Sequence, residues 1–325
     1  MKTICAVLAT LTTHSVLAWT AANWVNFEGG DMDVPANWVP EGVPTYVSGQ
    51  TDYLRPVFPA HEGDAPVTLG LSGDAIDFES LNFSQNAEYD LFFPGKAVGI
   101  WGVYSGGFFF DANSKVRLTS GVLRGAGGRK NMSGSGDFIV TGAGSIVSNV
   151  SVASGRVRIE NGGQWQGEVM MSGAGSFFHA TGAETLVGRG IDRTSLDSDT
   201  KKYFQLSSGA RGLIDDHATL SNVWRMATGN NGTGQARLDV SNATVWVNDG
   251  GIAMGSSADD SGNVIRFEGG SKIRLLSNNF DKFAIGIGRG GVSNTMVIAG
   301  AGTVVSNFIG YGTFVGHWSS GNRML

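Results

Sequence analysis

The sequence predicts an all-β protein, a three-sided β-solenoid in which short strands stack coil upon coil. Three observations lead to this fold class: abundant glycine, a motif that returns along the chain, and proline confined to one end. Glycine accounts for 50 of 325 residues and separates short strand-like runs, which argues against long helices. Apolar residues make up 41% and charged residues 16%, so the chain has enough apolar surface for a core and too much for disorder.

The returning motif is the strongest of these signals. Residues 142–149 read GAGSIVSN and residues 300–307 read GAGTVVSN, with a partial copy at 173–176. The same register continues through Ser208, Asn242 and Gly269, at intervals similar to that between Gly142 and Gly173. A period of this size is typical of stacked units that cannot bury an apolar face alone. We therefore expect coils of about 30 residues, with Gly142, Gly173, Gly269 and Gly300 along one seam.

Three strands of four to six residues and three turns fill one such coil. We expect the first strands at 138–140, 169–171, 203–206, 238–240, 264–267 and 296–298. Third strands are expected to end in an apolar pair and a glycine, at Gly188, Gly255, Gly286 and Gly316. Asn149, Asn248, Asn278 and Asn307 fall near the second corner, where stacked amides can hydrogen-bond along the rod.

One stretch also fits a helix. Leu213, His217, Leu220 and Trp224 keep a helical spacing within a glycine-free run at 213–228. We expect strands there, because Asp215 and Trp224 keep the register of the repeat, and a short inserted helix is the alternative.

The distribution of proline divides the chain. All seven prolines lie in the first 94 residues. Because proline lacks the N–H that a sheet ladder needs, we expect an irregular N-terminal cap and first strands over 19–94 and solenoid repeats over 95–325. The last unit restarts at Asn322, so we expect the chain to stop inside a repeat.

Residues 1–18 have the features of a secretory signal peptide: Lys2, an apolar run at 4–11, and Val16-Leu17-Ala18 before the cleavage point. Two alternatives are that this segment forms an N-terminal core strand, or that a lipid is attached at Cys5. Cys5 is the only cysteine, so a chain that begins at Trp19 has no disulfide, thiolate metal site or thiol nucleophile.

Charge and hydropathy limit the partners. The net charge is −5 and no basic run occurs, so nucleic acid is not expected as a partner. No apolar segment approaches the ~20 residues that span a bilayer. No cofactor is expected.

Several N-terminal motifs resemble those of autotransporter-associated β-strand repeat proteins, which are large exported bacterial proteins. The motifs are ANW at 22–24 and 36–38, GVPT at 42–45, SLNFS at 80–84 and YDL at 89–91. The resemblance implies a right-handed parallel β-helix passenger, secretion, display at the bacterial outer membrane or in the extracellular space, and repeats without enzyme activity. Membrane anchoring would then occur only through a C-terminal region that this chain lacks.

Asp215, Asp216 and His217, with Arg211 nearby, form the group most like an active site. Paired carboxylates beside a histidine can hold Ca²⁺ or abstract a proton from a uronic acid. A structural role is favoured, because Asp215 occupies a corner register held by asparagine elsewhere.

Other candidates are weaker. Asp192, Asp197 and Asp199 lie in a polar insertion that could bind calcium. His61, Glu62 and Asp64 are expected in a solvated loop, and SGSGD at 133–137 resembles a calcium-binding nonapeptide but does not repeat. His179 and His317 are interpreted as single residues without partners. The tryptophans outside the signal segment could stack sugars, although packing is favoured for most: Trp24, Trp38, Trp101, Trp165, Trp224, Trp246 and Trp318.

These features predict a secreted or surface-displayed, adhesin-like structural passenger without catalytic activity, whose partner is a host or cell-surface glycan or protein. A polysaccharide lyase or glycoside hydrolase on the same scaffold is the alternative, because the fold alone does not decide function. A carbohydrate-binding β-sandwich is a third option, which a repeat of this length disfavours.

Overall fold

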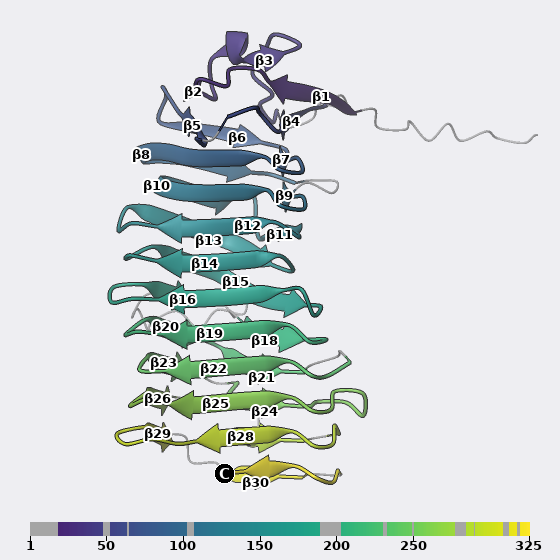
Figure 1. Ribbon diagram of the computed structural model, residues 1–325, viewed down its shortest axis with the longest axis vertical. Helices are drawn as coiled ribbons and strands as arrows, with labels where there is room; N and C mark the ends of the chain where they lie inside the picture. Colours follow the sequence, from purple (N-terminus) through teal and green to yellow (C-terminus); the bar gives the residue numbers. More distant parts are fainter. Residues whose placement is uncertain are drawn as a thin grey trace, which may run out of the picture.

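A computed structural model shows the protein as a rod of stacked β-coils (Figure 1). It describes residues 19–47, 53–63, 65–102, 107–188, 203–229, 233–248, 250–276, 284–288, 290–307, 312–316 and 319–325. The segment at 1–18 lies outside the described residues. The described strands join one sheet, and the only helical element in these ranges is the short 3₁₀ turn η1 (Pro35–Asn37).

Each coil contributes strands to three sides, which we number in chain order. Side 1 faces the viewer in Figure 1 and contains β2 (Gly30–Asp31), β5 (Val67–Gly70), the first halves of β8 (Glu88–Ile100) and β10 (Lys115–Gly125), β12 (Asp137–Thr141), β14 (Arg156–Glu160), β16 (Phe177–Thr181), β19 (Arg211–Asp215), β22 (Arg237–Ser241), β25 (Val264–Glu268), β28 (Thr295–Ile298) and β31 (Arg323–Met324).

Side 2 contains β6 (Ala75–Phe78), the second halves of β8 and β10, the first halves of β13 (Ser145–Val152) and β15 (Gln164–Ser172), β17 (Leu186–Gly188), β20 (Thr219–Val223), β23 (Thr244–Val247), β26 (Lys272–Leu275) and β29 (Val304–Asn307). Side 3 contains β1 (Trp19–Trp24), β4 (Tyr53–Phe58), β7 (Leu81–Phe83), β9 (Gly107–Phe110), β11 (Lys130–Gly134), the second halves of β13 and β15, β18 (Tyr203–Ser207), β21 (Arg225–Thr228), β24 (Ile252–Met254), β27 (Ile285–Ile287) and β30 (Thr313–Val315).

Every pairing between successive coils is parallel, and the predicted three-sided parallel β-helix is confirmed. Strand β3 (Trp38–Val39) departs from this rule, because it pairs antiparallel with β1 at the N-terminal end. Residues 213–228, where strands were expected and a short helix was the alternative, lie in β19, β20 and β21 and the turns between them. The expectation of strands is therefore confirmed. The composition boundary at Pro94 falls within β8, and parallel coils lie on both sides of it.

Coil length is not constant, although the sequence predicted one regular period. On side 1 the coil is shortest from Phe138 to Val157 and longest from Phe178 to Gly212. The distance from Gly142 to Gly300 therefore covers six coils, where five were expected. Extra residues lie in the corners, because the paired strands must keep their register. Equivalent inward positions form one column along side 1: Val67, Tyr89, Val116, Phe138, Val157, Phe178, Gly212, Leu238, Ile265, Met296 and Met324.

A left-handed residue follows the strand at the corner between sides 1 and 2. Its φ is positive in seven successive coils: Gly142 (91°), Asn161 (51°), Gly182 (91°), Asp216 (47°), Asn242 (48°), Gly269 (62°) and Gly300 (86°). Glycine, asparagine and aspartate adopt this conformation at the lowest cost, which explains the recurrence of small polar residues. Gly142, Gly269 and Gly300 thus share the predicted seam.

The prediction that Gly173 lies on that seam is wrong. Gly173 follows β15 at the corner between sides 3 and 1. Both GAGS segments fold into the same turn: Ser145 Oγ donates to the Thr141 carbonyl at 2.6 Å, and Ser176 Oγ donates to the Ser172 carbonyl at 2.7 Å. A local turn motif therefore recurs at two different corners, and this similarity misled the repeat assignment. The strands at 169–171 and 203–206 consequently lie on side 3, and Leu186–Gly188 lies on side 2.

An asparagine ladder exists, although it differs from the one predicted. Asn294 Oδ1 accepts hydrogen bonds from the Asn263 backbone N–H (3.0 Å) and side-chain amide (2.8 Å). Asn322 Oδ1 repeats this pattern with Asn294, at 2.9 and 3.0 Å. Asn263 and Asn294 are fully buried at the corner between sides 3 and 1. The predicted Asn149, Asn248 and Asn307 lie at the corner between sides 2 and 3, and Asn278 lies outside the described residues.

The core is built by alternation, since every second side chain of a strand points inward. Toward the N-terminus it is a stack of aromatic rings: Phe58 and Phe83 lie 4.6 Å apart between centroids, Phe83 and Phe108 5.4 Å, and Phe108 and Phe138 4.9 Å. Toward the C-terminus the buried positions are mainly aliphatic. Trp24 and Trp38 close the N-terminal end of the aromatic stack in an edge-to-face pair at 5.2 Å.

Candidate functional site

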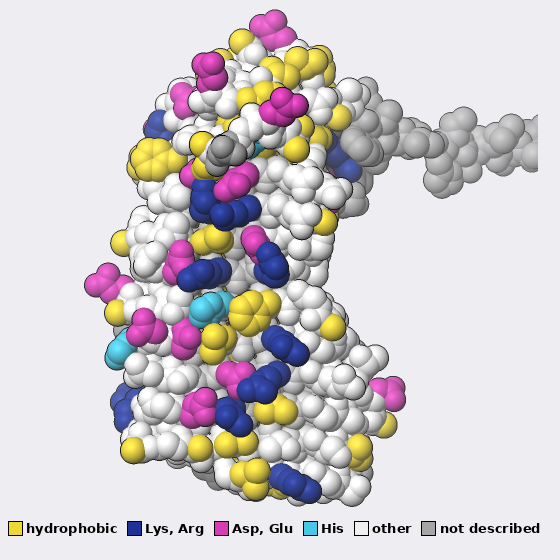
Figure 2. All heavy atoms as spheres, viewed as in Figure 1, with side chains coloured by type: hydrophobic (Ala, Val, Ile, Leu, Met, Phe, Trp, Pro, Cys, Tyr) yellow, Lys and Arg dark blue, Asp and Glu magenta, His cyan; other side chains and the backbone are white. Residues whose placement is uncertain are grey.

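Charged side chains gather on the outer face of side 1, in a band along the rod (Figure 2). Several of them pair across coils: Lys115 with Glu88 at 3.4 Å, Arg117 with Asp90, and Arg156 with Asp137. Others pair along a strand, such as Arg158 with Glu160 at 2.7 Å and Arg237 with Asp239 at 2.6 Å. The hydrogen bond with Asp90 raises the pKa of Arg117, and the one with Asp137 raises the pKa of Arg156. This band joins neighbouring coils by electrostatic contacts as well as by the sheet.

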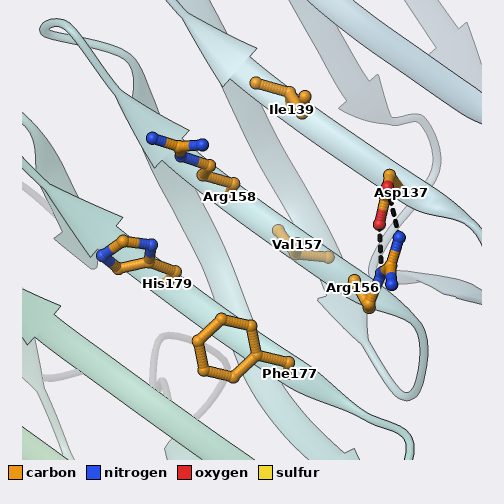
Figure 3. A pocket seen from close by; sticks show the side chains of 7 residues that line it. All are labelled: Asp137, Ile139, Arg156, Val157, Arg158, Phe177 and His179. Carbon is orange, nitrogen blue, oxygen red and sulfur yellow. Dashed lines mark hydrogen bonds and ion pairs between the residues drawn. The ribbon is translucent and has the colours of Figure 1, made fainter.

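A shallow trough interrupts the band over β12, β14 and β16 (Figure 3). Its volume is about 310 Å³, and it is lined by Asp137, Ile139, Arg156, Val157, Arg158, Phe177 and His179. The Phe177 and His179 rings lie 5.9 Å apart, with an angle of 38° between their planes. We refer to these seven residues as the side 1 trough. It combines an aromatic ring, two guanidinium groups and an imidazole on one open face.

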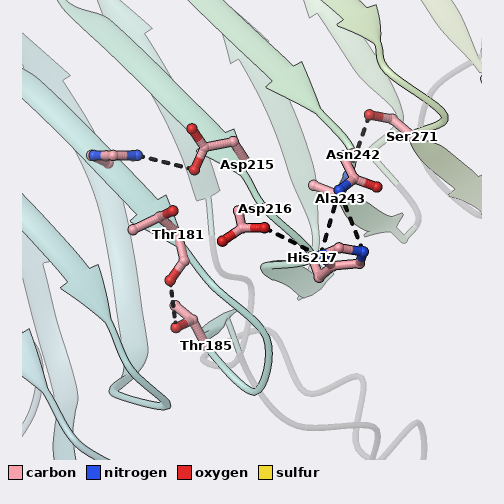
Figure 4. A network of polar contacts seen from close by, with 9 residues as sticks. Thr181, Thr185, Asp215, Asp216, His217, Asn242, Ala243 and Ser271 are labelled. Carbon is pink, nitrogen blue, oxygen red and sulfur yellow. Dashed lines mark hydrogen bonds and ion pairs between the residues drawn. The ribbon is translucent and has the colours of Figure 1, made fainter.

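The predicted group at Asp215, Asp216 and His217 is divided by the corner that follows β19 (Figure 4). Asp215 is on the strand, and its Oδ1 lies 3.1 Å from His179 Nε2 on the previous coil. Asp216 and His217 both have positive φ, and their side chains are 70% and 65% exposed. His217 contacts Asp216 (3.3 Å) and Asn242 (3.3 Å). Asp215 therefore belongs to the outer face of side 1, whereas Asp216 and His217 form an exposed turn.

Arg211 does not join this group. It lies at the opposite end of the extended strand from Asp215, which places their Cα atoms about 13 Å apart. Its nearest neighbours across the sheet are Phe177 and Arg237. A catalytic or calcium-binding role for the predicted group stays a prediction, and only Asp215 lies beside the trough.

His179 was interpreted as a residue without a partner, and this was wrong. Its contact with Asp215 joins residues 36 positions apart, across the longest coil of the described part. Alternation within residues 177–181 would have shown that Phe177 and His179 face outward. Their neighbours on the next coil could not be found from a constant period.

The remaining metal candidates stay predictions. Asp192, Asp197, Asp199 and Asp64 lie outside the described residues, as does His317. His61 Nε2 lies 2.9 Å from the Ala65 carbonyl, and its ring stacks on Phe27. Asp137, from the SGSGD segment, pairs with Arg156. Within the described ranges, no group of three or more His, Cys, Asp or Glu residues could hold a metal ion.

The tryptophans are mostly used in packing where the structure describes them. Trp24, Trp38 and Trp165 are buried, and their indole N–H groups donate to backbone carbonyls. Trp101 stacks on Tyr46 at 5.0 Å. Trp246 lies beside Arg274 at 6.0 Å. Trp318 is outside the described residues.

No protein family, curated protein or solved structure matches this chain. Among the described segments, no helix has the length and apolar character needed to cross a membrane.

Proposed function

We propose that this protein is a secreted or surface-displayed structural rod, an adhesin-like passenger that presents its outer faces to a glycan or protein. The observation that carries the proposal is the parallel pairing of coils from β4 to β31. Ten coil steps on side 1, at ~4.8 Å each, give a rod about 48 Å long. Such a scaffold holds side chains of distant sequence position in fixed rows.

The resemblance of the N-terminal motifs to autotransporter-associated repeat proteins supports export and display. The signal-like segment at 1–18 supports the same route. The charged band supports a structural role, because many of its acids and bases neutralise each other across or along the coils.

Export is tested by expressing the full chain in a Gram-negative host and fractionating the cells. We expect a mature chain that begins at Trp19 and lies outside the cytoplasm. A matched control lacks residues 2–18 and should stay inside. Retention of the intact chain in the cytoplasm, at the same expression level as the control, would contradict the proposal.

A lyase or glycoside hydrolase is the second candidate, and one observation favours it. His179 and Asp215 form a hydrogen-bonded pair beside an open trough that also holds Arg158, and imidazole–carboxylate pairs can transfer protons. Incubation of the purified chain with a panel of acidic and neutral polysaccharides separates the two functions. We expect no new reducing ends and no unsaturated uronate. Product formation that disappears in Asp215→Asn would establish the enzyme instead.

A further inference from the structure

The side 1 trough continues onto the next coil through Arg211. Phe177 and Arg211 are direct partners in the parallel ladder between β16 and β19, so their Cα atoms lie about 4.8 Å apart. Phe177 is half-buried and Arg211 is exposed, and both point outward. The trough therefore has an aromatic ring with a guanidinium group at its rim.

Arg211 differs from the nearest arginines of this band. Arg156 and Arg158 each contact a carboxylate, as does Arg237 on the coil after Arg211. No ion pair or hydrogen bond joins the Arg211 side chain to another residue in the described part of the chain. Its charge is thus available to an anion, and guanidinium groups bind carboxylates through two parallel hydrogen bonds.

The groups around Phe177 suit a sugar better than an apolar ligand. An aromatic ring offers a flat surface to the C–H face of a pyranose. Arg156, which pairs with Asp137, is the direct strand partner of Phe177, and the His179 ring lies 5.9 Å from the Phe177 ring, so donors and acceptors for hydroxyl groups border it. The paired charges nearly cancel, so a polyanion of high charge density gains little there, whereas a single carboxylate gains the contact with Arg211.

We propose that the side 1 trough binds an acidic oligosaccharide, with one sugar ring packed on Phe177 and its carboxylate held by Arg211. The inference rests on the display role proposed above, to which it adds a ligand class. The trough extends along the rod axis over β12, β14 and β16, so neighbouring sugars of a chain can follow it.

The test measures binding to the full-length purified chain by titration calorimetry. The probes are hexagalacturonate, its methyl ester with the same sugar skeleton but no charge, a hyaluronate hexasaccharide and sialyllactose. We expect saturable binding of at least one acidic probe. If hexagalacturonate binds, its methyl ester should bind about tenfold more weakly, because it loses the charge-assisted contact.

Four variants assign the site. Phe177→Leu keeps an apolar side chain and should weaken binding about fivefold or more through loss of the flat ring. Arg211→Gln should weaken binding of an acidic probe about tenfold and leave the methyl ester unchanged. Phe92→Leu removes another exposed ring of side 1, and Arg323→Gln removes an exposed arginine of the same outward row as Arg211. These two controls should stay within about twofold of the parent chain.

Circular dichroism and the thermal midpoint establish that each variant is folded. Absence of binding by all acidic probes at millimolar concentration overturns the inference, as does equal weakening by Arg323→Gln and Arg211→Gln. Export without binding would leave the display role and remove this ligand. Binding by a chain that is retained in the cytoplasm would support this ligand and contradict the display role.

Discussion

The short coils lie between β10 and β16, and the long coils begin at β19. Both fold around the same three sides, but they differ at the corners. The short coils use about 20 residues each and turn through tight corners. The long coils use about 28 residues each and add loops at the corner between sides 3 and 1. Coil length is therefore set by the corners, while strand register stays constant.

The two regions also differ in what stabilises a corner. At the corner between sides 3 and 1, a serine hydroxyl closes the turn of a short coil by donating to a backbone carbonyl, as Ser176 does to Ser172. In the long coils, buried asparagine amides replace backbone pairing and connect one loop with the next. A longer corner leaves more backbone groups without strand partners, and these amides satisfy them.

The largest expected effect is loss of core packing in the short coils. Phe138 is fully buried and lies 4.9 Å from Phe108, and Phe138→Ala should lower the free energy of unfolding by about 3–5 kcal/mol. Leu238→Ala, in the same column of a long coil, should cost less, about 2–4 kcal/mol. Urea unfolding of both variants measures the difference, and a loss below about 1 kcal/mol for Phe138→Ala would contradict the aromatic stack.

Loss of the amide ladder comes second. Asn294→Ala removes the acceptor of the buried Asn263 N–H and two donated hydrogen bonds, and should cost about 2–3 kcal/mol. Hydrogen exchange should accelerate around Asn263 and Asn322 and stay unchanged in the short coils. Asn131→Ala, at an exposed asparagine of β11, is the matched control and should change stability by less than about 0.5 kcal/mol. Uniform acceleration along the rod would mean that the ladder does not act locally.

Backbone conformation at the short corners gives a smaller effect. Gly142 has φ of 91°, where an L side chain is strained, so Gly142→Ala should destabilise by about 1–2 kcal/mol. Gly144, two residues later, has no positive φ, and Gly144→Ala should be nearly neutral. Thermal unfolding of the two variants checks this, and equal midpoints would contradict the left-handed corner.

The ion pairs of the outer face give the smallest effect. Arg156 and Asp137 are both solvent-accessible, so Arg156→Gln should cost no more than about 1 kcal/mol. Salt screens such pairs, and the difference from the parent chain should shrink between low salt and about 1 M NaCl. A cost above about 2 kcal/mol that salt does not reduce would show that the band contributes more than the geometry indicates.

The sequence was sufficient for the fold class, because strand alternation and turn residues are local signals. Gly142, Gly269 and Gly300 also fell on one corner as expected, since each must adopt positive φ after a side 1 strand. Gly173 did not, because its turn is locally the same as that of Gly142. A turn motif reports backbone conformation and does not identify the corner.

The side 1 trough could not be predicted for a related reason. Its residues and Arg211 come from successive coils of unequal length, so no constant period brings Asp137, Phe177 and Arg211 together. The asparagine ladder did carry a signal. Gly262-Asn263, Ser293-Asn294 and Gly321-Asn322 each place an asparagine after a residue with positive φ, at spacings of 31 and 28.

Stacking of successive coils in the described register is the central claim, and engineered disulfides test it most directly. In a Cys5→Ser background, Thr141→Cys and Glu160→Cys lie on adjacent strands about 4.8 Å apart, within disulfide range. Thr141→Cys and Ser172→Cys are separated by one predicted repeat but lie on different sides of the rod. Mild oxidation, followed by mass spectrometry, should join the first pair and leave the second reduced. A disulfide in the second pair only would contradict the coil assignment.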